Sequence, residues 1–145
     1  MLTPIVAAFT SACTTLSKNF LFGTLSEDLN KPSMGQYDEL VFLQSYSTGN
    51  IDAKLLKYGS GNIGFQMSLY VLEKYNEADK AITKQAKWDA ALTTALAVIN
   101  QACTVNRNVQ RSIVNASPHT EILRFGSGNY IATRININFS NYWQC

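Results

Sequence analysis

The chain is poor in the residues that usually carry catalysis or metal binding. Its 145 residues include one histidine, and Asp and Glu together number ten. His119 follows Pro118 in a segment that we expect to be a loop, with no acidic cluster beside it. A zinc site needs several His, Cys or carboxylate ligands, and acid–base catalysis needs a positioned partner. We therefore expect no enzyme, no cofactor and no metal site.

Cysteines are few and far apart. Cys13, Cys103 and Cys145 are odd in number and show no C-x-x-C spacing. We expect the first two to be small buried hydrophobic residues in helices, and Cys145 to be exposed. The spacing predicts no disulfide framework.

Long hydrophobic runs and an excess of one charge are also missing. No run reaches the roughly 18 apolar residues of a spanning helix, and the apolar start lacks the positive charge of a signal peptide. The net charge of +2, with 15% charged residues, is too weak to indicate a nucleic-acid or membrane surface. An apolar content of 46% is enough for one domain over residues 1–145. The neutral polar remainder suits packing against other subunits, although solitary domains share it.

One short motif occurs twice. Gly-Ser-Gly-Asn stands at residues 59–62 and again at 126–129, each time before a run of alternating apolar residues. Glycine supplies the backbone angles of tight turns, and alternation is typical of strands with one buried face. Phosphate-binding loops need a different spacing and open a helix. The repeat therefore predicts two turns, each leading into an antiparallel strand.

The hydrophobic spacing predicts two long helices. One runs from Thr3–Pro4 to about Phe22–Gly23, and the other covers 78–104 and lies on the sheet through four apolar residues. These four are Ile82, Leu92, Leu96 and Ile99.

Five strands complete the prediction, at 40–46, 63–72, 109–115, 120–125 and 130–139. The order α-β-β-α-β-β-β indicates an α+β fold with a single mainly antiparallel β-sheet and two helices packed on one face.

Candidate contact residues fall mainly in the segment 47–62. It is polar, rich in glycine and long for a simple connection, and such loops often contact a partner. The apolar contacts would come from Ile51, Leu55 and Leu56, and the polar rim from Lys54 and Lys57. The alternative is a flexible loop that binds nothing.

Further candidates lie near the end of the chain. Arg134, Asn136 and Asn138 share the face of the last strand opposite its apolar residues, where they are either solvated or bonded to a neighbouring subunit. Tyr142 and Trp143 follow that strand. They are either interface anchors or folded back on the core.

The order of elements and their local sequences resemble a known family. The segment 20–25 (Phe-Leu-Phe-Gly-Thr-Leu) follows the first helix, and a short strand spans 40–43. A strand that ends at 69–74 then precedes an alanine-rich helix, and the final strand follows a Gly-Asn turn. This pattern resembles the small tail-terminator or tail-completion proteins of tailed bacteriophages, particularly those of phages that infect gut Bacteroidetes, crAss-like phages included.

The resemblance implies a structural virion protein that forms a homo-oligomeric ring. The ring would terminate the tail or join it to the neck, with six subunits expected on a tail axis and twelve as the alternative for a ring facing the portal. Its partners would be copies of itself and other tail or neck proteins, with genomic DNA passing through the lumen without sequence-specific binding. We expect no membrane partner, synthesis in the bacterial host cytoplasm and a final place in the virion. No catalytic residue is carried over.

Two other classes of function remain open at this point. The chain could be a different neck or connector ring component, or a small non-catalytic protein-binding domain. An enzyme with an unfamiliar site is the third class. A ring has a fixed stoichiometry and buries heterologous faces, whereas a monomeric module does neither.

Overall fold

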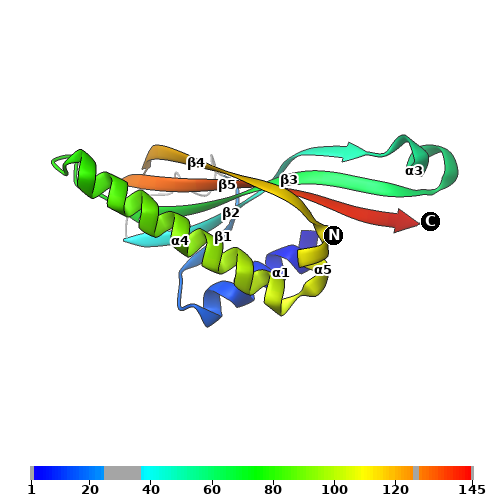
Figure 1. Ribbon diagram of the computed structural model, residues 1–145, viewed down its shortest axis with the longest axis horizontal. Helices are drawn as coiled ribbons and strands as arrows, with labels where there is room; N and C mark the ends of the chain where they lie inside the picture. The colour runs from blue at the N-terminus through cyan, green and yellow to red at the C-terminus, as the bar shows by residue number, and fades with distance from the viewer. Residues whose placement is uncertain (1, 25–36, 126–127, 145) are drawn as a thin grey trace.

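The structure is a computed structural model that describes residues 2–24, 37–125 and 128–144. Its strands form one sheet, and a layer of helices lies on one side of that sheet (Figure 1). The helices are α1 (Leu2–Thr15), α3 (Ala53–Tyr58), α4 (Ala81–Val105) and α5 (Arg107–Ser112). The strands are β1 (Phe20–Gly23), β2 (Glu39–Ile51), β3 (Ser60–Lys74), β4 (Ile113–Phe125) and β5 (Gly128–Gln144).

The sheet has five strands in the order β1-β2-β3-β5-β4. β1 runs parallel to β2, and every other neighbouring pair is antiparallel. β3 and β5 pair without a break from Ser60–Gln144 to Lys74–Tyr130. The α+β class and the mainly antiparallel sheet are therefore as predicted, and the β3–β5 pair is the axis of the molecule.

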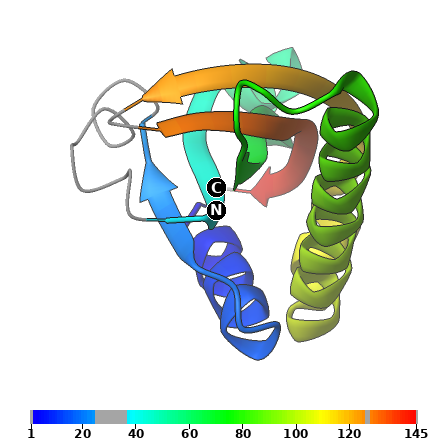
Figure 2. The same ribbon diagram turned by 90° about the vertical axis from the view of Figure 1, so that its left-hand side faces the viewer.

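The helical layer covers one face of the sheet. Figure 2 looks along the long axis and shows α1 below the strands and α4 at the right, running from the level of the strands down to that of α1. The prediction of two long helices on one face is confirmed. The core between the layers contains the apolar residues of the sheet that face the helices, together with the inner faces of the helices. Its members include Ile5, Phe9, Cys13, Val41, Met67, Leu69, Ala95, Val98, Ile135 and Ile137.

A smaller apolar cluster lies on the opposite face of the sheet. Its buried members are Leu40, Phe42, Tyr70, Leu72, Tyr130 and Ala132. The Tyr130 hydroxyl donates to the backbone oxygen of Tyr37 at 2.8 Å, which satisfies a polar group that is otherwise buried. Farther along this face β3 and β5 carry the polar residues Gln66, Ser68, Arg134, Asn136 and Asn138, so the two faces differ there.

The contact stripe of α4 differs from the prediction. Ile82 and Leu96 are 78% and 55% exposed, whereas Leu92 and Ile99 pack at the margin of the core. The buried row is Ala91, Ala95, Val98 and Ala102. Small side chains let the helix approach the sheet closely, and the apolar residues of this helix occur on most of its sides. The periodicity therefore left several orientations open, and close packing selected the alanine row.

The first helix ends earlier than predicted, at Thr15, and Ser17 then adopts a left-handed conformation with φ of 56°. Residues 20–23 form strand β1 instead of a last helical turn. Phe20 packs in the core below the sheet and Leu21 in the cluster above it. This alternation between faces is that of a strand, and it was too short to recognise.

The predicted strand at 109–115 is wrong in its first half. Residues 107–112 form α5, and the side-chain oxygen of Asn106 accepts from the Asn108 N–H at 3.0 Å, as a helix N-cap does. The second half of that predicted strand and the strand predicted at 120–125 belong to one continuous strand, β4, which includes Pro118 and His119. Proline is tolerated there because β4 is an edge strand.

Candidate functional site: a projecting arm

Three strands continue past the helical layer as a narrow extension. We define the arm as residues 48–66 and 138–144, which comprise the end of β2, helix α3, the start of β3 and the end of β5. It is the right-hand part of the molecule in Figure 1, with α3 near its tip. The segment predicted as a long polar connection at 47–62 is therefore mostly regular secondary structure.

Two residues hold α3 in place at the tip. Asp52 is the N-cap, and its carboxylate accepts from the Lys54 N–H at 3.1 Å. Gly59 is the C-cap with φ of 77°, and its N–H donates to the Leu55 oxygen at 3.0 Å. The first Gly-Ser-Gly-Asn copy therefore ends a helix and begins β3, where the sequence predicted a turn before a strand.

The second copy of the motif spans the β4–β5 connection. Gly126 and Ser127 lie outside the described residues, and Phe125 pairs with Gly128 on either side of them. The strand that follows this copy, β5, is antiparallel to both β4 and β3, as predicted.

Gly61 lets α3 pack against the start of β3. A Cβ atom at this position would lie 2.9 Å from the Leu55 backbone nitrogen and 3.1 Å from the Leu55 Cβ. These distances are shorter than ordinary contacts, so the close approach requires glycine. The tip is thus held by two caps and one tight contact, although α3 itself buries no residue.

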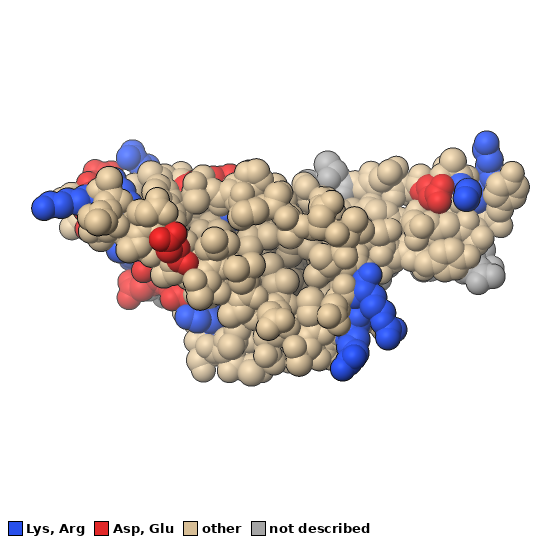
Figure 3. All heavy atoms as spheres, in the orientation of Figure 1, with Lys and Arg blue, Asp and Glu red and all other residues tan. Residues whose placement is uncertain are grey.

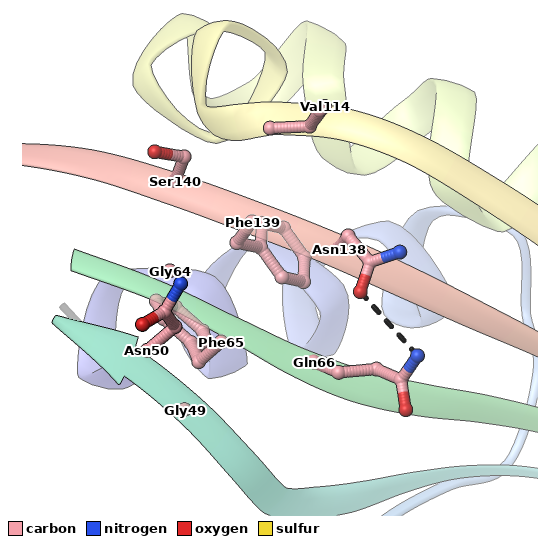
Figure 4. A pocket seen from close by; sticks show the side chains of 9 residues that line it. All are labelled: Gly49, Asn50, Gly64, Phe65, Gln66, Val114, Asn138, Phe139 and Ser140. Atoms are coloured by element: carbon pink, nitrogen blue, oxygen red, sulfur yellow. Dashed lines mark hydrogen bonds between the residues drawn. The ribbon is translucent and has the colours of Figure 1, made fainter. Parts of the chain in front are cut away.

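The base of the arm is held by an aromatic pair. The rings of Phe65 and Phe139 stack with centroids 5.3 Å apart and planes at 19°. A shallow hollow of about 380 Å³ lies over this pair, between β2, β3, β5 and the exposed Val114 of β4 (Figure 4). Its lining is mostly glycine, amide and aromatic residues, and none of the nine lining residues is charged.

Exposed apolar side chains gather on the arm. Ile51, Leu56, Tyr58 and Tyr142 are 50%, 75%, 79% and 66% exposed. Such side chains cost free energy in water unless a partner covers them, so a group of them on an ordered element marks a candidate contact surface. We take the arm as the candidate functional site.

All five predicted contact residues of 47–62 lie in the arm. Ile51 ends β2, and Lys54, Leu56 and Lys57 are exposed on α3, whereas Leu55 is half-buried beside Gly61. Tyr58, the most exposed large apolar side chain of the described residues, was not among the predicted contact residues. Its position beside the helix-ending Gly59 was the signal that could have found it.

The end of the chain contributes one more exposed aromatic residue. Tyr142 lies within β5, not after the strand as predicted, and its side chain is held out in solvent. Trp143 pairs with Gly61 in the β3–β5 register, and its side chain lies outside what the structure describes.

The polar residues predicted on β5 interact across the sheet. On the face away from the helices, Arg134 pairs with Glu121 at 2.8 Å and Asn136 accepts from the Ser68 hydroxyl at 2.7 Å. Asn138 accepts from Gln66 and donates to Asn115. Arg134 and Asn136 lie outside the arm, so the structure separates them from the other candidates. Each has a partner within this chain, although the buried Nε of Arg134 has none among the described residues.

The described residues contain no group of three or more His, Cys, Asp or Glu side chains that could hold a metal ion. His119 is exposed on β4 rather than in a loop, with its Nε2 3.4 Å from the Ser117 hydroxyl. Cys13 is buried as predicted, and burial raises the pKa of its thiol to about 11 against a smaller opposing effect of Lys18. Cys103 is half-buried, and Cys145 lies outside the described residues.

The outer surface of the helices carries little charge. No Lys, Arg, Asp or Glu occurs in residues 2–17 or 90–106, which cover α1 and most of α4. In Figure 3 the charged atoms lie mainly toward the two ends and at the lower edge, leaving the middle of that face almost bare. None of the helices in the described ranges is long and apolar enough to cross a membrane.

No family model matches the chain, and no curated protein matches it.

Proposed function

We propose that the chain is a structural virion protein of a tailed bacteriophage, and that its copies form a ring that terminates the tail or joins it at the neck. The observation that carries the proposal is the arm: an ordered extension whose exposed side chains include Ile51, Leu56, Tyr58 and Tyr142. Together with the resemblance to tail-terminator proteins, it favours an assembly role over chemistry.

The arm suits a repeated assembly because it lies at one end of an elongated molecule. A surface at one end that meets a different surface on the next copy is heterologous, and heterologous contacts close into rings when the rotation between copies allows it. The capped tip also reduces the entropy lost on binding, because α3 is already ordered before contact.

The helical layer offers a second surface of the kind found in interfaces. Its exposed residues are mainly Thr, Ala and Ser, with Ile82, Leu96 and Val105 as large apolar members. Charged residues are depleted at the centres of protein interfaces, and here they are absent over two helical stretches. Copies of the chain, and other tail or neck proteins, are the partners that we propose for these surfaces. A ring of six is proposed for a tail axis, with DNA passing through its lumen.

Imaging of the purified protein and of virions tests this function. We expect negatively stained protein to form closed rings of uniform diameter, and an antibody against this chain to label virions where the tail meets the head. Rings labelled elsewhere on the particle would favour a different neck or connector component. A monomeric protein absent from virions would favour the small binding domain and contradict the proposal.

A further inference from the structure

The two outer strands of the arm have open edges. β1 pairs with β2 only at residues 41–44, and β4 pairs with β5 only as far as Phe139. Beyond these points, no described strand lies beside residues 48–51 of β2 or 140–144 of β5. The arm of each molecule therefore has one free edge on either side of β3 (Figure 1).

The backbone hydrogen bonds fix which groups point outward from these edges. The Asn129 oxygen accepts from the Tyr75 N–H, and the Asn62 oxygen accepts from the Asp52 N–H. In an antiparallel ladder the backbone N–H and C=O groups of successive residues point alternately toward the partner strand and away from it. On β5 the backbone groups of odd residues therefore point toward β3 and those of even residues point away from it. On β2 the backbone groups of even residues point toward β3 and those of odd residues point away. The outward backbone groups of the arm are therefore those of Ser140, Tyr142 and Gln144 on β5, and of Gly49 and Ile51 on β2.

The other edges of the sheet are protected, and these two are not. β4 has Pro118 at a position whose backbone nitrogen points outward by the same alternation, so this edge lacks one hydrogen-bond donor. β4 also has two charged residues, Glu121 and Arg124. β1 has only four residues. Proline, charge and shortness are the usual means of preventing edge-to-edge pairing. The free edges at 48–51 and 140–144 contain neither proline nor a charged residue.

We propose that the β5 edge of one copy pairs with the β2 edge of a second copy, so that the arm sheets join from subunit to subunit. β2 and β5 are both antiparallel to β3, so they run in the same direction. Copies placed side by side in one orientation therefore pair these edges in parallel. Pairing β5 with β5 about a two-fold axis would leave the β2 edge open, whereas the head-to-tail pairing uses both. The inference rests on the proposed ring, and it adds the contact that would build it.

Proline substitutions at outward positions test the pairing. Tyr142→Pro and Ile51→Pro each remove one outward N–H and, by the alternation above, no bond to β3. Tyr142→Thr and Ile51→Thr are the matched controls, because they remove the same side chain and keep the N–H. We expect both proline variants to lose the oligomer and run as single subunits with the wild-type circular dichroism spectrum. Both threonine variants should still form the oligomer, at a higher protein concentration than the wild type, because each loses an exposed apolar side chain of the arm.

Mixing the two proline variants tests the direction of pairing. Each keeps one intact edge, so a one-to-one mixture should form dimers of one copy of each variant and nothing larger. A mixture that stays monomeric would overturn the head-to-tail pairing, and so would Ile51→Pro alone forming dimers. Proline variants with the wild-type mass would overturn the inference and leave the ring proposal standing. A monomeric wild-type protein would contradict both the edge pairing and the ring.

Amide hydrogen exchange gives a readout that does not depend on the variants folding. In the wild-type assembly, we expect slow exchange at the outward N–H groups of Gly49, Ile51, Ser140 and Tyr142, because pairing protects them. Exchange there as fast as in an unpaired edge would contradict the inference, even if the proline variants prove unfolded.

Discussion

At the scale of single residues, the glycines of the arm have different roles. Gly59 ends α3 in a left-handed conformation, and Gly61 allows α3 to lie against β3. Gly49 faces the Gly64 oxygen at an ordinary distance, with 3.5 Å to an added Cβ. The three positions look alike in the sequence, yet only two of them require glycine.

The pair Gly61→Ala and Gly49→Ala tests this difference. Gly61→Ala should displace α3, because its Cβ would overlap Leu55. We expect faster amide exchange at Leu55 and Gly59, whose backbone groups cap the helix. Gly49→Ala should leave exchange at the tip unchanged and shift the free energy of unfolding by less than about 1 kcal/mol. Equal effects of the two substitutions would contradict the packing of the tip.

The carboxyl group of Glu73 lies in an environment that disfavours its charged form. It pairs directly with Glu39 across β2 and β3. Burial raises the pKa of Glu73 above 4.5, and the charge of Glu39 adds to this, while Lys87 and Lys18 oppose it. The folded chain therefore holds this proton more tightly than the unfolded chain does. The stability that Glu73 contributes is present at low pH and is lost as the pH rises through its folded pKa.

Glu73→Gln should for this reason raise the free energy of unfolding at pH 7, with the gain over the wild type shrinking toward zero below about pH 4. Urea unfolding at a series of pH values measures it. Glu121→Gln is the contrast, because it breaks the 2.8 Å ion pair with the half-buried Arg134 and should lower stability at pH 7. A Glu73→Gln variant less stable than the wild type at pH 7 would refute this account of the site.

At the scale of elements, α4 shows how a small-residue row sets the position of a helix. Ala91, Ala95 and Ala102 are buried against the sheet and the other helices, and α4 contacts β3, β5 and α1. A larger side chain in that row has no space to occupy.

Neighbouring substitutions on α4 separate the two sides of the helix. Ala95→Leu should destabilise the protein by about 1–3 kcal/mol or more, because it overpacks a fully buried site. Leu96→Ala should change the free energy of unfolding by no more than about 0.5 kcal/mol, because that side chain is exposed. Thermal and urea unfolding of both variants measure the difference. A larger loss for Leu96→Ala would mean that the predicted stripe, not the alanine row, faces the sheet.

The elements that the sequence predicted well are those with a long, simple pattern. Strict alternation located the middle of β3 and of β5, and helical spacing located α1 and α4. The ends of β2 and β3 in the arm were missed because glycine, serine and asparagine dilute the alternation there. α5 was missed because its six residues contain Val109 and Ile113 follows it, which resembles a strand when tertiary contacts are unknown.

At the scale of the whole molecule, the candidate site exists because β2, β3 and β5 extend beyond the helical layer. The sequence indicated that residues 47–62 contact a partner, and the structure places Ile51, Lys54, Leu56 and Lys57 together on the arm. It did not indicate that the end of β5 lies beside them, because the register of two strands far apart in the chain cannot be read from local patterns. The contribution of Tyr142 to the same surface follows from that register.

The mass of the protein in solution tests the central claim most directly. Native mass spectrometry over a range of protein concentrations would measure it, with the single chain of 16.1 kDa as the unit. A closed ring predicts one dominant species of six or twelve subunits, whose subunit number stays fixed as the concentration rises. A single chain at every concentration, or a continuous series of ever larger species, would contradict the ring.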